Sequence, residues 1–236
     1  MHIDDSSTPH PQLGLFPHAH FHGEPYKPAH ESDAMLSGVM PVNTASQYGW
    51  RPYVLKLHRA TKLHLDLRLC DLWIARSWAL YAMPSFCPEQ ITTAIQVADH
   101  LRKHIAFEGV HPEGKRGAGP TIVVDHGCWQ PLLAHSNIGA QVRQGSLRFW
   151  LKGKHLHGLW SLKRRSNGYV EHPHWDLRKE PDVYALSKHL THTLCEDAFR
   201  SSLSGKTIRE IEQEWYTKRR SFRACGSLFI CEKSVE

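Results

Sequence analysis

The sequence predicts a mainly β protein, in which an antiparallel sheet curls into a barrel or a sandwich and a helical segment follows it. Three observations support this fold class. Short runs alternate between apolar and polar residues, glycine-containing turns separate these runs, and no 3.6-residue repeat occurs before about residue 180. We therefore divide the chain into residues 1–45, 46–180 and 181–236.

Residues 1–45 are rich in proline, serine, histidine and glycine, and they show no strand or helix period. This composition predicts a disordered or loosely packed segment. The run HAHFH within it is a weak candidate for binding a soft divalent metal. It has no carboxylate or cysteine partner at a useful spacing, so a simple surface segment is the better interpretation.

Residues 46–180 contain the predicted strands. In chain order these are YVLKLH, LHLDLRL, ARSWALYAM, ITTAIQVADH, TIVVDHG, SLRFWLKG and HLHGLWSLKRR. The last two are expected to form a hairpin across Gly153 and Lys154, with Leu156, Trp160 and Leu162 on its inner face. The run PEGKRGAGP is expected to be a turn-rich loop that bends the sheet.

In residues 181–236 the sequence pattern becomes that of helices. We expect one helix in PDVYALSKHLTHTLCEDAFRSSLSG, a second in KTIREIEQEWYTKRR, and a short last strand in SLFICEK. Ile208, Ile211 and Trp215 share one face of the second helix, so this face should pack against the barrel. The segment is thus predicted to be a helical extension of the barrel.

The composition excludes several classes of protein. There is no run of about 18 apolar residues, which argues against a membrane span, and the start lacks the pattern of a secretory signal. The six cysteines form no C-x-x-C pair, so we expect reduced thiols in a cytoplasmic protein. Gln141 to Val170 holds seven Lys or Arg and no Asp or Glu, which favours a polyanion such as nucleic acid; an ordinary solvated basic face is the alternative.

The run LHLDLRL carries the strongest chemical signal. Leucine alternates there with His64, Asp66 and Arg68, so the three polar side chains project from one strand face, about 6–7 Å apart. His58 can reach the same place from the preceding turn or strand. Two imidazoles and a carboxylate suit a divalent metal with open positions, and Arg68 beside them matches two oxygens of a phosphate. The competing interpretation is an ordinary polar strand face.

A second cluster lies in VADHLRKH, where His100 and His104 can face the same site if this run ends a strand at the rim. Histidine transfers protons near neutral pH and binds phosphate as imidazolium. In a chain with 19 histidines, two ordinary loop residues are a serious alternative. No phosphate-loop, G-x-S-x-G or zinc-finger motif is present in the sequence.

Several motifs occur together in a fixed order: H-x5-H-x-D-x-R, SWA, DH, FEGVHPEGKRGAG, VVDHGCWQP and GSLRFWLKGKHLHGLWSLKRR. From Tyr53 to Arg165 this series resembles the 3′-phosphoesterase domain of bacterial DNA ligase D. The resemblance implies a compact antiparallel β-barrel that removes a 3′-terminal ribonucleoside, and then the 3′-phosphate, from DNA ends during repair by non-homologous end joining. It also implies manganese as the typical metal.

Carried onto this chain, the resemblance implies that His58, His64 and Asp66 are the metal ligands. Arg68 and His100 would hold the scissile phosphate, and His104 occupies the place of a tyrosine that the family usually has. The enzyme would be a metal-dependent hydrolase of phosphodiesters and phosphomonoesters at 3′ ends.

The chain departs from the family pattern around this metal set. Ala98 and Lys56 replace a common glutamate and a common glutamine, and Ala82 replaces a lysine. With His104, these changes predict an intact metal core but a weakened phosphomonoesterase step; the alternative is a non-catalytic protein that binds nucleic-acid ends. The sequence is too short for the ligase and polymerase domains often fused to this module. We therefore expect a stand-alone version that acts with a separate ligase or end-joining factors.

Overall fold

The computed structural model describes five stretches of the chain: residues 49–114, 117–133, 137–166, 171–187 and 199–228. The segment 1–45, which the sequence predicts to be loosely packed, lies outside these stretches. Among the described residues, no helix has the length and apolar character needed to cross a membrane.

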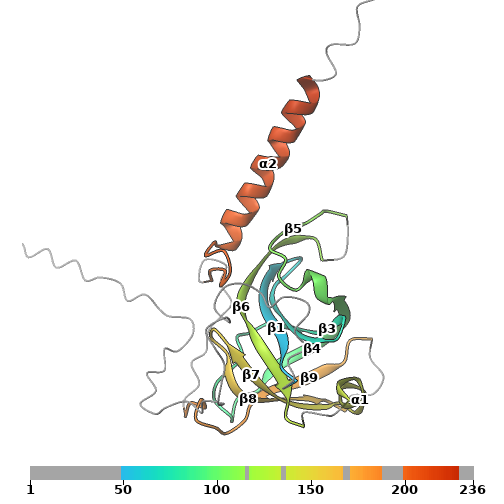
Figure 1. The fold of residues 1–236 in the computed structure, drawn as a ribbon, viewed down its shortest axis with the longest axis vertical. Helices are drawn as coiled ribbons and strands as arrows, with labels where there is room; N and C mark the ends of the chain where they lie inside the picture. The colour runs from blue at the N-terminus through green and yellow to red at the C-terminus, as the bar shows by residue number, and fades with distance from the viewer. Residues whose placement is uncertain (1–48, 115–116, 134–136, 167–170, 188–198, 229–236) are drawn as a thin grey trace, which may run out of the picture.

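Nine strands form one antiparallel sheet. They are β1 Arg51–Arg59, β2 Leu63–Asp71, β3 Ile74–Leu80, β4 Thr92–Leu101, β5 Gly109–His111, β6 Gly119–Pro131, β7 Ser146–Gly153, β8 His157–Arg164 and β9 His174–Lys179. Eight of them follow the order β1-β2-β3-β4-β9-β8-β7-β6, and β6 pairs again with β1. The sheet therefore closes into a barrel, which confirms the predicted fold class (Figure 1). The ninth strand, β5, pairs with the start of β6.

The barrel interior is the hydrophobic core, and the strand alternation seen in the sequence fills it. Leu65, Leu67 and Leu69 from β2 are buried in this core, together with four tryptophans from other strands: Trp78, Trp129, Trp160 and Trp175. Successive strand residues point to opposite faces. The residues between the leucines of β2 therefore lie on the outside of the barrel, and this outer face carries the candidate site.

The predicted hairpin forms as expected. β7 pairs with β8 from Ser146↔Lys163 to Lys152↔His157, and Leu156, Trp160 and Leu162 all lie in the core. The expected strand TIVVDHG is longer than predicted, because β6 continues to Pro131 while it moves from pairing with β1 to pairing with β7. A sequence run that ends in Asp-His-Gly has the composition of a turn, but tertiary pairing keeps it extended.

Four short elements were not predicted from the sequence. They are β5, β9, the helix α1 Ile138–Gln144 and the 3₁₀ turn η1 Arg102–His104. α1 has only seven residues, too few to show a helical period, and it is defined by its caps. The Asn137 side chain accepts a hydrogen bond from the Ala140 N–H, and Gly145 ends the helix with a φ of 81°.

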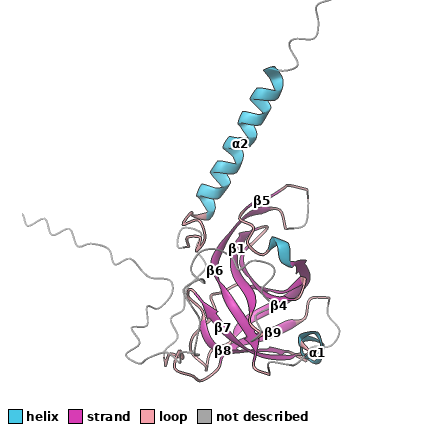
Figure 2. Cartoon of the chain, viewed as in Figure 1, coloured by secondary structure: helices cyan, strands magenta, loops and turns pink. Residues whose placement is uncertain are grey.

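The C-terminal segment is only partly as predicted. The second expected helix exists as α2 Ile208–Leu228, which projects away from the barrel (Figures 1 and 2). Ile208 is buried, Ile211 packs against the core and Trp215 is half-buried. The first expected helix does not appear in the described parts of its range, since 181–187 and 199–205 form turns and bends without helix. Its middle, 188–198, lies outside the described residues, as does most of the expected last strand.

Candidate metal and phosphate site

The outer faces of β1 and β2 present one continuous polar row. Antiparallel pairing sets each residue of β1 directly opposite one of β2, at a Cβ separation of about 5 Å. Three consecutive outward pairs form the row: His58↔His64, Lys56↔Asp66 and Val54↔Arg68. Register alone therefore brings His58 beside His64, although five residues separate them in the sequence.

This outer face is buried, which is unusual for the polar side of a strand. The segment that runs from η1 to β5 lies over it, and Ile105 of this segment packs into a small apolar cluster outside the barrel. The other buried members of that cluster are Val54, Cys70, Ala75 and Val123. As a result Asp66 and Arg68 are each only 5% exposed and His58 only 7%. Charged groups at such depth need partners or ligands.

His58, His64 and Asp66 form the centre of the site. One ligand atom from each of the three lies within 4.8 Å of the other two. Asp66 Oδ1 is 3.4 Å from His64 Nε2, and Asp66 Oδ2 is 3.8 Å from His58 Nδ1. Two imidazoles and a carboxylate are a common donor set for divalent transition metals.

Hydrogen bonds to backbone carbonyls fix which ring nitrogens are free. His58 Nε2 lies 3.1 Å from the Gly117 carbonyl oxygen, and His64 Nδ1 lies 2.9 Å from the Lys62 carbonyl oxygen. A carbonyl only accepts, so both of these nitrogens carry the proton. In the neutral rings the lone pairs are then on His58 Nδ1 and His64 Nε2, the two atoms that face Asp66. Ligating histidines in metal sites are usually held in this way.

The electrostatics agree with a cation at this point. Burial lowers the pKa of His58 to about 4, so the ring is neutral at pH 7. Burial also acts to raise the pKa of Asp66, but a hydrogen bond from His64 and the charge of Arg68 outweigh it and leave the carboxyl ionised. For His64, Asp66 outweighs burial and raises the pKa. A proton on His64 and a metal ion would therefore compete for the same position beside Asp66.

Arg68 and His100 extend the site along β2 and β4. Arg68 Nη2 donates to Asp66 Oδ2 at 2.9 Å, while the buried Arg68 Nε has no hydrogen-bond partner. Ser77 Oγ donates to the Ala75 carbonyl at 2.9 Å, so its oxygen accepts from His100 Nδ1 at 3.0 Å. This contact leaves His100 Nε2 available to a substrate. Burial, and then the charge of Arg68, lower the pKa of His100.

His104, the remaining predicted residue, lies at the margin of this cluster. It is exposed at the end of η1, where it acts electrostatically on His111. The structure therefore brings His58, His64, Asp66, Arg68 and His100 together, with His104 at the edge.

Two further residues of the cluster were not assigned a role from the sequence. The ring of His111, from β5, lies 5.6 Å from that of His58. Lys56 lies on β1 beneath Phe107, with Nζ 5.6 Å from the ring centroid. Lys56 alternates with His58 in YVLKLH, so the strand period contained a signal for it. No local pattern indicated His111, because β5 has only three residues.

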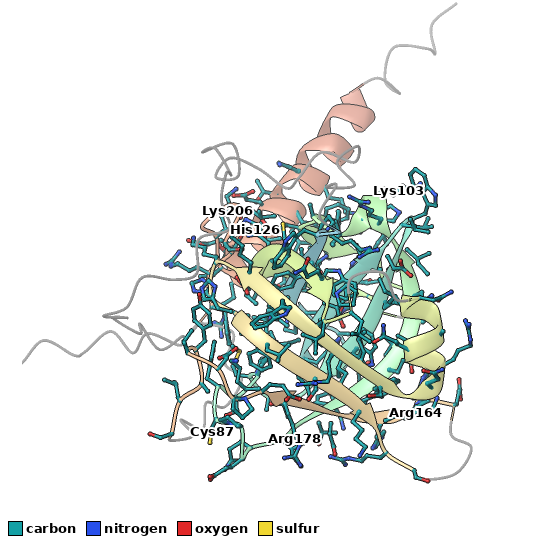
Figure 3. The ribbon with its side chains drawn as sticks, turned by 60° about the horizontal axis from the view of Figure 1, so that its bottom comes forward. Cys87, Lys103, His126, Arg164, Arg178 and Lys206 are labelled. Carbon is teal, nitrogen blue, oxygen red and sulfur yellow. The ribbon has the colours of Figure 1, made fainter. Side chains whose placement is uncertain are left out.

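The basic strands lie elsewhere on the barrel. In the closed order of strands, β8 is four places from β2 in either direction, so it lies across the barrel from the site. In Figure 3, Lys103 is at one end of the molecule and Arg164 and Arg178 are near the other. Two of the basic side chains also have acidic partners, as Arg148 pairs with Glu180 and Arg165 with Asp176. This basic surface therefore does not border the metal cluster.

Comparisons with known proteins agree with this geometry. Residues 56–164 match the family described as the DNA ligase D 3′-phosphoesterase domain. The chain is 37% identical over 135 residues to a multifunctional non-homologous end joining protein LigD of Pseudomonas aeruginosa, covering 57% of this chain and 16% of that protein.

A LigD DNA repair protein of Mycobacterium tuberculosis is 32% identical over 120 residues, or 49% of this chain and 15% of that protein. The chain thus spans about one sixth of the length of these relatives. The matched residues begin at Lys56 and contain every element of the metal and phosphate cluster.

Proposed function

We propose, from the match of residues 56–164 to the DNA ligase D 3′-phosphoesterase domain family, that this chain is a metal-dependent 3′-phosphoesterase. Its substrates would be DNA ends that carry a 3′-terminal ribonucleoside or a 3′-phosphate. Hydrolysis of the terminal phosphodiester releases the ribonucleoside and leaves a 3′-phosphate, and a second hydrolysis releases inorganic phosphate and leaves a 3′-hydroxyl. Such an end is ready for ligation in non-homologous end joining at nucleoid DNA.

One observation carries this proposal. His58 Nδ1 and His64 Nε2 both face the ionised oxygens of Asp66, so two ring nitrogens and one negative charge converge on a single point where a divalent cation fits and where a proton on His64 is its competitor. The donor set of two imidazoles and one carboxylate fits manganese among other divalent ions. When bound, such an ion would polarise a phosphoryl oxygen and neutralise developing negative charge.

The other side chains of the cluster would bind and orient the phosphate. Arg68 already donates through Nη2 to Asp66, and its unpartnered Nε is a donor available for a phosphate oxygen. His100, held through Nδ1 by Ser77, can present Nε2 to the leaving group or to the phosphate. His104 is placed to contact the substrate at the margin. Arg68 would stabilise negative charge through a donor that is oriented before the substrate arrives, whereas His100 in its neutral form has a lone pair at Nε2 and donates there only after it takes up a proton.

The proposal predicts a simple result with labelled DNA. Primer-template duplexes that end in one or two 3′-ribonucleotides, or in a 3′-phosphate, should be shortened or dephosphorylated in the presence of manganese and not after chelation. His64→Ala should remove this activity and reduce manganese binding measured by electron paramagnetic resonance, while the melting temperature stays near that of the parent protein. Lys218→Met, an exposed change on α2, serves as the matched control.

The second candidate function is a non-catalytic protein that binds nucleic-acid ends. Ala98, exposed on β4, and His104 are the two positions that favour it, because each departs from the residue usual in the family. The same assay separates the two functions. Tight binding of the duplex with no product under any metal condition would overturn the enzyme proposal and support the alternative.

A further inference from the structure

Lys56 is the residue of the cluster that the proposed mechanism does not use. Its side chain is completely buried, and no hydrogen-bond acceptor among the described residues reaches Nζ. Asp66 is its direct cross-strand neighbour, yet the carboxylate is bonded to Arg68 instead. An ammonium group without an acceptor is unfavourable at this depth, so its presence requires an explanation.

The charges around Lys56 do not balance. Burial, and then the charge of Arg68, lower the pKa of Lys56 to about 7, so its amine is only partly protonated near pH 7; a bound anion would favour the protonated form. The buried Arg68 Nε also lacks a partner. Asp66 and Glu108 are the acidic groups that act on Lys56. Asp66 is bonded to Arg68, and Glu108 accepts the backbone N–H of Val123 at 2.7 Å. A divalent cation beside Asp66 would increase the positive excess.

Lys56 Nζ and Arg68 Nε are two buried donor atoms without acceptors, on side chains that repel each other. Together they form a site for an anion. From this geometry we propose that Lys56 Nζ and Arg68 Nε donate to the same phosphate group of the substrate. Because the site contains two cationic side chains, it favours an anion with two negative charges. A terminal 3′-phosphate carries up to two negative charges near neutral pH and three unesterified oxygens, whereas a phosphodiester carries one charge and two such oxygens. Lys56 therefore favours the terminal phosphate over the phosphodiester.

This inference rests on the proposed function for the identity of the substrate, and it opposes the sequence-based expectation of a weakened phosphomonoesterase step. The cation–π contact with Phe107 holds the lysine from above, and Phe107 is 39% exposed. Phe107 covers the ammonium, and because this ring is itself partly exposed, a terminal phosphate would reach Lys56 Nζ when the ring turns aside.

The test compares Lys56→Met and Lys56→Gln, which remove the charge, with Lys56→Arg, which keeps it. Lys218→Met is the control, because that lysine is exposed on α2 and outside the cluster. Binding of duplexes ending in a 3′-phosphate or a 3′-hydroxyl is measured by fluorescence anisotropy in the presence of a chelator. Initial rates with manganese are then measured separately for phosphate removal and for ribonucleoside removal.

The parent protein and the control should prefer the 3′-phosphate end by at least about tenfold, the effect of one charge-assisted contact. Lys56→Met and Lys56→Gln should lose this preference without a lower melting temperature, and Lys56→Arg should keep part of it. With manganese, kcat/KM for phosphate removal should fall about tenfold more than kcat/KM for ribonucleoside removal. Equal losses in both steps, or an unchanged preference in the uncharged variants, would overturn the role of Lys56.

Failure of the proposed function would appear differently. The parent protein could cleave neither end but still prefer the 3′-phosphate, and the uncharged variants could lose that preference. In that case the enzyme proposal is wrong, and the phosphate-binding role of Lys56 and Arg68 is supported. If the parent protein shows no preference between the two ends, the inference about Lys56 is wrong whatever the rates are.

Discussion

Asp66 and Asp125 are two buried carboxylates on the two strands that flank β1. Their hydrogen-bond partners differ in charge. Asp125 is fully buried and accepts hydrogen bonds from the Tyr53 hydroxyl at 2.6 Å and from the backbone N–H groups of His155 and Leu156 at 2.9 and 3.0 Å. Neutral donors saturate its oxygens. The oxygens of Asp66 face a guanidinium and two ring nitrogens instead.

The difference separates a carboxylate that neutral donors saturate from one that has cationic partners. Burial raises the pKa of Asp125 to about 6, and its hydrogen bonds only partly oppose this shift, so the group tolerates being neutral. The pKa of Asp66 moves the other way, because cationic partners outweigh burial and keep the carboxylate ionised. Burial alone therefore does not indicate function; the nature of the partners does.

The largest expected effect is on activity at Asp66. Asp66→Asn keeps the shape of the side chain but removes the charge that a cation needs, so we expect 3′-end processing to fall by roughly 1,000-fold. The leucine core stays intact, but the buried pair with Arg68 loses its charge, so the protein should still fold with a lower melting temperature. Initial rates with manganese, together with circular dichroism and thermal melting, check both parts. Near-parent activity would place the metal elsewhere.

Asp125→Ala should produce the reverse pattern. The Tyr53 hydroxyl and two buried N–H groups lose their acceptor, so the free energy of unfolding should fall by about 4 kcal/mol. The metal and phosphate side chains stay in place, so the folded fraction should keep the parent rate constant. Urea denaturation and rates corrected for the folded fraction measure the two effects. A specific loss of kcat in fully folded protein would contradict the structural assignment.

The pH dependence of stability separates His58 from Asp125 in metal-free protein. His58 has a lowered pKa of about 4, so its contribution is present above its ordinary pKa of 6.5 and is lost as the pH falls through 4. Asp125 has a raised pKa of about 6, so its contribution is present below its ordinary 3.8 and is lost as the pH rises through 6. Each amounts to about 3 kcal/mol, and the two have opposite signs between about pH 4 and 6.

Asp125→Asn removes one of these opposing contributions. Relative to the parent, its free energy of unfolding should gain about 3 kcal/mol as the pH rises from 4 to 6. Urea titrations with chelator at half-unit intervals of pH measure this slope. Parallel profiles for the two proteins would mean that Asp125 does not titrate in this window.

The smallest expected effect concerns His104 at the exposed margin. His104→Tyr keeps a hydrogen-bond donor on a longer side chain at an exposed position, so the rates of both hydrolytic steps should change by less than about tenfold. The pH–rate profiles of the parent and the variant, measured from pH 5.5 to 8.5, should show whether the imidazole contributes an ionisation. Superimposable profiles would remove His104 from the catalytic set.

The strand alternation explains why so much of this site was predictable. In LHLDLRL, the period of two assigns leucine to the core and His64, Asp66 and Arg68 to one outer face, and the structure keeps that division. The spacing of His58 from His64 fits a tight hairpin, and the structure contains this hairpin, with His58 paired to His64 across β1 and β2. These relations hold because a strand and its hairpin partner are local in the sequence.

Contacts between distant segments decided what the sequence alone did not determine. The polar face of β2 is buried because Ile105 and the segment leading to β5 lie over it, and the barrel closes because β6 pairs with β1. His111 reaches His58 only through the pairing of β5 with the start of β6. Lys56 alternates as any solvated lysine would, and only this covering deprives its ammonium of water and of an acceptor. The sequence determined which side chains share a face, whereas the tertiary structure decided which of them are desolvated and therefore require a ligand.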